Sequence, residues 1–141
     1  MDIVIYHNPE CGTSRNVLSI INAAGYQSTV IEYLKTGWTE PQLLGLFAAA
    51  SLNPRTALRE TKSPAQELGL LEEGITQQQI MSAMLEYPVL VNRPIVCTPK
   101  GVKLCRPSEM VLDLLGRLPP GPLHKEDGEL LIDANGKRVG G

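Results

Sequence analysis

The spacing of apolar residues in the first part of the chain predicts a strand, a helix and a second strand. Residues 2–6 form a short, mainly β-branched apolar run, which is typical of a buried strand. From about Thr13 to Ala24, apolar residues recur with the period of a helix and end at Gly25, a residue suited to the position after a helix. Residues 28–34 form another strand-like run. A unit of this length favours two parallel strands joined by a right-handed crossover.

The middle of the chain, residues 39–88, has a helical pattern that turns interrupt. Thr39 is a candidate N-cap for a helix that ends before the next Asn-Pro pair. Proline and glycine residues divide 54–75, so we expect short helical pieces joined by turns there. Thr76 caps a further predicted helix at about 77–86. The pattern therefore predicts a helical block between two strand-bearing parts.

The apolar runs that follow predict a hairpin and a final helix. A run over 88–98 leads into a third strand, a tight turn follows at 99–101, and 102–105 returns as a fourth strand. Ser108 is a candidate N-cap for the last helix. The apolar stripe of that helix consists of Met110, Val111, Leu114 and Leu115.

The tail, residues 119–141, is rich in proline and glycine at first and then charged. An Asn-Gly pair at 135–136 predicts a small hairpin over 129–139. We expect the tail to pack on, or to extend, a single domain formed by residues 1–118.

The order βαβ, helical block, ββα predicts an α/β thioredoxin-like fold: a small mixed four-stranded sheet with a helical insertion at about 39–88. In that architecture the first helix carries a reactive cysteine at its N-terminus, and a cis proline before the third strand faces it. Arg93-Pro94 stands at that place. We therefore predict a cis Arg93–Pro94 bond, although only about 5–6% of X-Pro bonds in folded proteins are cis.

The charge and the cysteine count narrow the class of protein. A net charge of −2 over 141 residues gives no broad basic surface, so we expect no nucleic-acid partner. Three cysteines are few and odd in number, which argues against a disulfide scaffold and for a reducing compartment. There is no C-x-x-C pair, and only two histidines occur, so no metal site is expected. Without a leader pattern or a long apolar segment, we expect a cytoplasmic protein with no membrane contact.

Cys11 lies in the loop between the first predicted strand and the first predicted helix, at the helix entrance. Unpaired backbone N–H groups and the positive end of the helix dipole meet there, and Gly12, Thr13 and Ser14 supply these groups. They favour the thiolate, which is the nucleophile, and they can also hold an oxyanion. A lone cysteine is often a small buried apolar residue, but the loop and cap residues around Cys11 favour a reactive thiol.

Three separated stretches resemble motifs of the glutaredoxin-linked arsenate reductases. They are 7–15 (His-Asn-Pro-Glu-Cys-Gly-Thr-Ser-Arg), 92–96 (Asn-Arg-Pro-Ile-Val) and 104–109 (Leu-Cys-Arg-Pro-Ser-Glu). The resemblance extends over nearly the whole chain and includes Lys-Glu-Asp-Gly at 125–128. Three motifs in the same order are a specific signal, whereas one cysteine alone is a weak one.

The resemblance implies a role for each matching residue. Cys11 is the expected nucleophile, and His7 is the residue expected to help lower the pKa of its thiol. Arg59, Arg93 and Arg106 match the positions that bind the arsenic oxyanion, and the fork of a guanidinium fits two oxygens of tetrahedral arsenate. The alternative for each arginine is a solvated surface charge, and for His7 it is a hydrogen bond to the backbone. Arg59 lies in the segment with the weakest pattern.

The resemblance also implies the chemistry and the partners. The Cys11 thiolate attacks arsenic, water leaves and a covalent adduct forms. Glutathione, a co-substrate rather than a bound cofactor, attacks the adduct, glutaredoxin delivers the reducing equivalents, and arsenite is released. Ser14 occupies the place of the second cysteine of a thioredoxin-type motif, which supports an external reductant. We expect a monomer with no tightly bound cofactor.

The sequence leaves open the roles of two other cysteines and two alternative functions. Cys97 and Cys105 are expected to be structural, with an internal resolving thiol as the second hypothesis. A non-catalytic regulator of the same superfamily typically carries a C-x-x-C switch, and Ser14 argues against it. A glutathione-dependent thiol reductase is the remaining alternative, although the three matching arginines argue for an oxyanion substrate.

Overall fold

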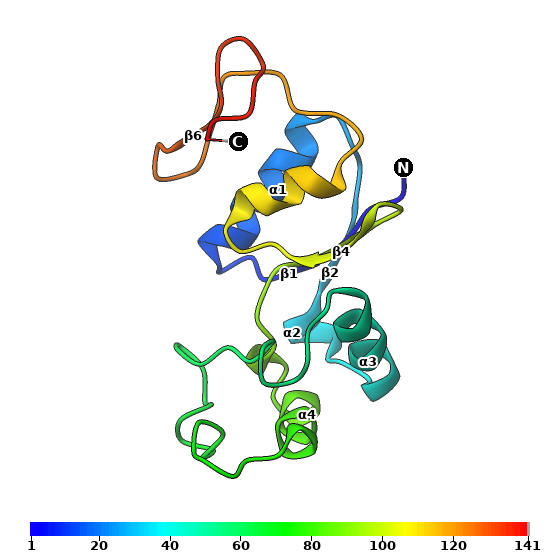
Figure 1. Ribbon diagram of the computed structural model, residues 1–141, viewed down its shortest axis with the longest axis vertical. Helices are drawn as coiled ribbons and strands as arrows, with labels where there is room; N and C mark the ends of the chain where they lie inside the picture. The colour runs from blue at the N-terminus through cyan, green and yellow to red at the C-terminus, as the bar shows by residue number, and fades with distance from the viewer. Residues whose placement is uncertain (141) are drawn as a thin grey trace. The chain divides into compact units, whose positions relative to one another are not determined.

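The computed structural model describes residues 1–140, which form two compact units (Figure 1). One unit contains Met1–Ile31 and the chain from Arg93 onward, including the tail. The other contains Glu32–Asn92. No helix among the described residues is both long enough and apolar enough to span a bilayer. The predicted domain bounds stay a prediction.

The first unit is built on a four-stranded sheet with the order β2-β1-β3-β4. Its strands are β1 (Val4–His7), β2 (Thr29–Glu32), β3 (Ile95–Thr98) and β4 (Gly101–Leu104). The strand β3 pairs antiparallel with both β1 and β4, and the register Thr98↔Gly101 leaves the predicted tight turn between β3 and β4. The α/β class and the mixed four-stranded sheet are confirmed.

The helix α1 (Gly12–Ala23) connects β1 to β2. Its predicted apolar face is buried, because Val17, Ile20, Ile21 and Ala24 all lie in the hydrophobic core. The predicted end is also confirmed. Gly25 has a positive φ of 85°, and its N–H donates to the carbonyl of Asn22 at 3.0 Å.

The last predicted helix is a 3₁₀ helix, η2 (Ser108–Leu114), and it lies beside α1 on one face of the sheet (Figure 1). The prediction that Ser108 is its N-cap is wrong. Pro107 takes that position in extended backbone, and Ser108 is already the first helical residue, with its side chain buried. Side chains from β1, α1, β3 and η2 share one core, which includes Ile5, Val17, Ile20, Val96, Val111 and Leu114.

The tail contributes a two-stranded sheet, β5 (Leu123–His124) and β6 (Leu130–Ile132), which the sequence analysis missed. The predicted Asn-Gly turn is present, because Gly136 N–H donates to Asp133 O at 3.0 Å. The predicted hairpin is short but present: Ile132 and Arg138 form a bridge, Asp133 N–H donates to Lys137 O at 2.8 Å, and Val139 N–H donates to Leu131 O at 2.9 Å. The ladder that was not predicted pairs β6 with β5, and β6 buries two apolar side chains in the core.

The second unit contains α2 (Tyr33–Thr36), α3 (Glu40–Ala49), α4 (Gln77–Glu86) and η1 (Pro88–Leu90). Thr39 and Thr76 cap α3 and α4 as predicted, each within a capping box.

Two predictions for this part of the chain are wrong. Tyr33 and Leu34 belong to α2 rather than to the second strand, because the buried Tyr33 ring stacks on Trp38 at 5.0 Å and Gly37 turns the chain with a φ of 71°. Residues 54–75 form turns instead of short helical pieces, and the positive φ values of Lys62, Gly69 and Gly74 interrupt any helical path at these three points.

Candidate active site

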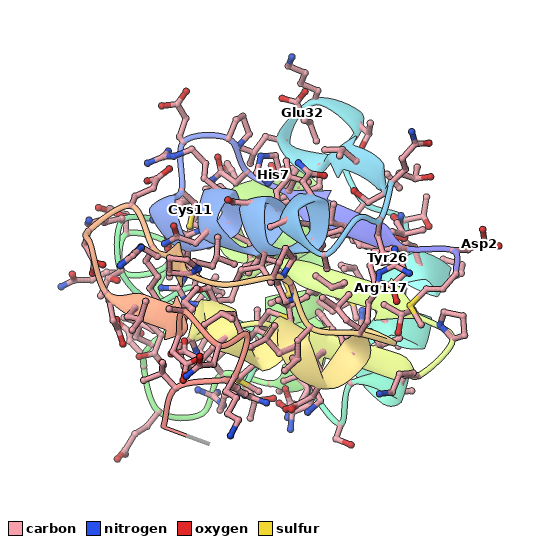
Figure 2. All side chains as sticks on the ribbon, turned by 90° about the horizontal axis from the view of Figure 1, so that it is seen from above. Asp2, His7, Cys11, Tyr26, Glu32 and Arg117 are labelled. Atoms are coloured by element: carbon pink, nitrogen blue, oxygen red, sulfur yellow. The ribbon has the colours of Figure 1, made fainter. Side chains whose placement is uncertain are left out.

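Cys11 is the N-cap residue of α1, with extended backbone angles of φ −100° and ψ 121°. Its N–H donates to Asn8 O at 3.0 Å, and its carbonyl accepts from Arg15 N–H at 3.0 Å. These bonds place the cysteine at the junction of the loop and the first helical turn, as predicted. Figure 2 shows Cys11 at one end of α1, with Tyr26 and Arg117 at the other end.

The surroundings of Cys11 favour the thiolate although the residue is only 6% exposed. Burial raises the pKa of the thiol, but four groups together lower it below its ordinary value. They are the backbone N–H of Ser14, the charge of Arg93, a hydrogen bond from Arg106 and the backbone N–H of Thr13. The helix terminus and the guanidinium groups outweigh desolvation, which is the direction that the sequence predicts.

Arg106 contacts the thiol, and Arg93 acts on it through its charge. Arg106 Nη1 lies 3.8 Å from Cys11 Sγ and also donates to Arg93 O at 3.1 Å. The Arg93 side chain is buried, whereas Arg106 lies at the surface. The Arg93–Pro94 bond is cis, so that prediction is confirmed; the cis bonds before Pro107 and Pro122 were not predicted.

Ser14 and His7 form a buried pair behind the loop. Ser14 Oγ and His7 Nδ1 are hydrogen-bonded at 2.6 Å, and the same oxygen accepts from Asn8 N–H at 3.1 Å. Ser14 thus acts through two groups: its backbone N–H lowers the pKa of Cys11, and its hydroxyl joins His7 to the loop. The sequence analysis gave a hydrogen bond to the backbone as the alternative role of His7, whereas its partner in the structure is the Ser14 side chain. A role of His7 in thiol acidity stays a prediction.

Arg59 belongs to the unit Glu32–Asn92. There its Nε donates to Thr61 O at 3.0 Å, and its N–H donates to Leu90 O at 2.8 Å. The first unit brings Cys11, Arg93 and Arg106 together; the contact of Arg59 with an oxyanion stays a prediction.

Two residues beside the site were missed by the sequence analysis. Arg15 donates to both carboxylate oxygens of Glu126, at 2.9 and 3.0 Å, and to Pro9 O at 2.8 Å. Arg15 lies in the first helical turn after Cys11, and Glu126 lies in the turn between β5 and β6. Arg15 and Glu126 lie in the matching stretches 7–15 and 125–128, but no role was attached to either residue.

A family model described as the ArsC family matches residues 6–114, most of the chain. The chain belongs to the ArsC family.

Individual relatives agree with this assignment. "Arsenate reductase ArsI2" of Synechocystis sp. is 74% identical over 137 residues, which cover 97% of this chain and 98% of the relative. "Arsenate reductase" of Escherichia coli is 49% identical over 138 residues, 98% of each chain. Among solved structures, "Arsenate reductase from Vibrio cholerae" superposes with a TM-score of 0.76 at 35% identity, covering 82% of this chain and 98% of that one.

The other two cysteines of this ArsC-family chain have a different character. Burial raises the pKa of the Cys105 thiol to about 12, and Sγ lies 3.7 Å from Lys103 O. Burial also raises the pKa of Cys97 on β3. All three cysteines are free thiols. Within residues 1–140, no three His, Cys, Asp or Glu side chains converge in a way that could hold a metal ion.

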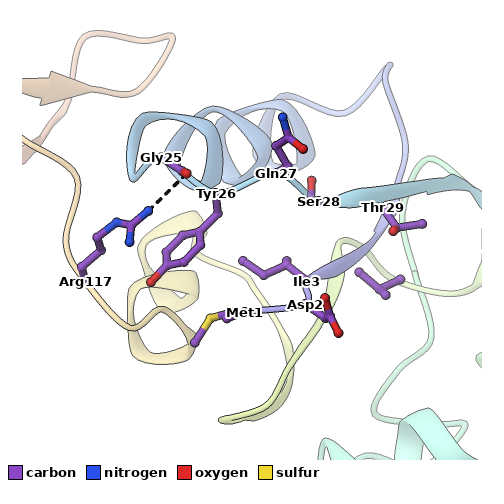
Figure 3. A pocket seen from close by; sticks show the side chains of 10 residues that line it. Met1, Asp2, Ile3, Gly25, Tyr26, Gln27, Ser28, Thr29 and Arg117 are labelled. Carbon is purple, nitrogen blue, oxygen red and sulfur yellow. Dashed lines mark hydrogen bonds between the residues drawn. The ribbon is translucent and has the colours of Figure 1, made fainter.

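A pocket of about 640 Å³ lies at the far end of α1 from Cys11, lined by residues 1–4, 25–29 and 117 (Figure 3). Arg117 stacks its guanidinium 4.2 Å from the centre of the Tyr26 ring. It donates to Ala24 O at 2.6 Å and to Gly25 O at 3.2 Å. These contacts satisfy carbonyls at the end of α1, so we assign Arg117 a helix-capping role and place the chemistry at Cys11.

Proposed function

We propose that this chain reduces arsenate to arsenite through a covalent Cys11–arsenic adduct, with glutathione and glutaredoxin as the source of electrons. The observation that carries the proposal is the pairing of a thiol at the α1 N-terminus with the Arg106 guanidinium, 3.8 Å from its sulfur. Curated relatives that are 74% and 49% identical bear the name arsenate reductase, which supports this substrate.

The charges around the thiol suit a tetrahedral oxyanion. The N–H groups of the first turn of α1, at Gly12, Thr13 and Ser14, are free of the helical ladder and can donate to arsenate oxygens. The guanidinium of Arg106 offers two parallel donors, and Arg93 adds a buried positive charge. Arg59 is the third arginine proposed for the oxyanion.

The proposed reaction begins with attack of the Cys11 thiolate on arsenic. A sulfur–arsenic bond forms, an arsenic–oxygen bond breaks, and the displaced oxygen leaves as water after taking up protons. Glutathione then attacks the arsenic of the adduct and displaces a second oxygen as water, and the thiol of glutaredoxin attacks the glutathione sulfur. As(V) gains two electrons while these two external thiols are oxidised to a mixed disulfide. Water finally cleaves the sulfur–arsenic bond, which releases arsenite and regenerates the Cys11 thiol.

External thiols are required because this chain lacks a resolving cysteine next to Cys11. Ser14 stands where a thioredoxin-type motif has its second cysteine, and its hydroxyl is hydrogen-bonded to His7. Burial raises the pKa of the Cys105 and Cys97 thiols, so few of them are ionised to the nucleophilic thiolate at neutral pH. We further propose that the protein acts as a monomer in the cytoplasm, where glutathione keeps these thiols reduced.

A coupled assay tests the proposal. Purified protein is mixed with arsenate, glutathione, glutaredoxin, glutathione reductase and NADPH, and NADPH oxidation is followed. We expect turnover that requires arsenate and both thiol components, with none in a Cys11→Ser variant. Turnover with a glutathione mixed disulfide in place of arsenate, and none with arsenate itself, would replace the proposal by a thiol reductase.

A further inference from the structure

The turn Lys125–Gly128, here called the tail turn, joins β5 to β6 and touches the segment that carries Cys11. Glu126 receives two hydrogen bonds from Arg15, at 2.9 and 3.0 Å. The backbone N–H of Glu126 also donates to Asn16 Oδ1 at 3.0 Å. Through Arg15, whose Nη1 donates to Pro9 O, the same contact reaches the loop on the other side of Cys11. The tail turn therefore holds the active-site loop from both sides of the cysteine.

The preceding residue of the tail turn holds a different segment. Lys125 Nζ lies 3.1 Å from Glu109 Oε1 and 3.1 Å from Glu129 Oε2, and its side chain is 12% exposed. Glu109 lies in the first turn of η2, three positions after Arg106. Consecutive residues of one turn are thus ion-paired to the two segments that supply the thiol and the guanidinium.

The contact between those two segments is weak at the Cys11 sulfur, the atom that is proposed to react. Arg106 Nη1 reaches Cys11 Sγ at 3.8 Å, the long end of hydrogen bonds to sulfur. A guanidinium at the surface on a long side chain has many other orientations available, so its position over the thiol depends on how its segment is held. Reaction rates are sensitive to displacements of about 1 Å at such a site.

We propose that Lys125 and Glu126 are positioning residues for the Cys11 chemistry: together they hold the Arg106 segment against the start of α1. The proposal rests on Cys11 as the nucleophile of the proposed function. The family model ends at residue 114, whereas the individual relatives match 97–98% of the chain. The side chains of Arg15 and Glu126 are 44% and 51% exposed, and ion pairs this exposed add little to global stability, so their loss should leave the protein folded.

The decisive variant is Glu126→Gln, with Glu129→Gln as the matched control. The control removes the same charge three positions further along the chain, just before β6, but leaves Lys125 paired with Glu109. Both are made in a Cys97→Ser/Cys105→Ser background, and the Cys11 thiolate is titrated by its ultraviolet absorbance. Loss of a nearby negative charge alone would lower the pKa of Cys11. A released Arg106 would raise it, and we expect a rise of about half a unit or more for Glu126→Gln only.

A second measurement tests whether the two residues act as a unit. Loss of either the Lys125–Glu109 or the Arg15–Glu126 ion pair should release Arg106. The double variant Lys125→Gln/Glu126→Gln should therefore shift the Cys11 pKa no further than the single variant that has the larger effect. We expect kcat/KM for arsenate to fall in parallel, by about threefold or more. The thiolate titration needs no turnover, so it tests the tail turn even if arsenate proves not to be the substrate. An unchanged or lowered pKa in Glu126→Gln, an equal rise in Glu129→Gln, or additive shifts would each overturn the proposal.

Discussion

Cys11 and Cys105 are buried in the same unit, yet the pKa values of their thiols shift in opposite directions. Burial raises the pKa of both, and at Cys105 it prevails and raises the value to about 12. At Cys11 the N–H groups of α1, the Arg93 charge and the Arg106 hydrogen bond reverse the effect. Burial alone therefore does not decide whether a cysteine is inert; the position within the secondary structure does.

The backbone explains this difference. Cys11 precedes a helix, where the first N–H groups have no partner within the helix. Cys105 follows β4, and the N–H group of the next residue, Arg106, already donates to Leu104 O at 3.0 Å. The positive charge of Lys103 lowers the pKa of Cys105, but less than burial raises it, and the charges of Asp113 and Cys97 raise it further. The Cys105 thiol at the end of β4 therefore has neither the backbone N–H donors nor the guanidinium hydrogen bond that lower the pKa of Cys11.

The largest expected effect belongs to Cys11→Ser. A hydroxyl is a poor nucleophile at neutral pH even at a helix N-terminus, so arsenate reduction should fall at least about a thousandfold, to background. The coupled NADPH assay measures the loss, and circular dichroism should show an unchanged fold. Cys105→Ser is the control, and comparable losses in both variants would contradict the contrast between the two sites.

Alkylation should separate the two thiols directly. At pH 7 a thiol with a pKa of about 12 is ionised in roughly one molecule in 10⁵. We expect iodoacetamide to label Cys11 at least about a hundredfold faster than Cys105, as followed by mass spectrometry of peptides. Because the pKa of Cys11 is lowered, its rate should rise with pH and level off below the pH at which an ordinary cysteine does. Equal labelling of the two residues in folded protein would refute the argument.

The guanidinium geometry should matter at the next level. Arg106 Nη1 alone contacts both Cys11 Sγ and Arg93 O. Arg106→Lys keeps the positive charge but loses the planar fork of parallel N–H donors that fits two oxygens of arsenate. We expect kcat/KM for arsenate to fall about tenfold or more, which corresponds to about 1.4 kcal/mol. Arg93→Lys should behave similarly. Arg117→Lys, at the far end of α1, is the matched control, and equal kinetics in all three variants would show that the guanidinium geometry at positions 93 and 106 has no part in arsenate reduction.

Features that depend on near neighbours in the sequence could be predicted. The entrance of α1, the caps at Thr39 and Thr76 and the β3–β4 turn each follow from a few adjacent residues. The cis bond at Pro94 followed from the recognised architecture rather than from local chemistry.

Features that depend on distant contacts could not be predicted. Arg15 and Glu126 are separated by 111 positions, and neither lies in a pattern that indicates the other. Tyr33 reads as a strand residue because it is aromatic and follows a β-branched run, and only its stacking on Trp38 shows why the chain turns there. The β5–β6 ladder is too short for alternation to reveal it.

The smallest expected effect concerns the cysteines away from α1. If their thiols are structural, the Cys97→Ser/Cys105→Ser variant should keep its glutathione- and glutaredoxin-dependent activity within about twofold, because serine is close in size to cysteine. The unmodified protein, mixed with arsenate alone and quenched with acid, should show no intramolecular disulfide by mass spectrometry. A linkage from Cys11 to Cys97 or Cys105, together with loss of activity in the matching serine variant, would show that an internal thiol resolves the adduct. The contrast between the helix entrance and the strands would then describe the free protein but not its reaction, because a thiol with a raised pKa would still have been close enough to attack.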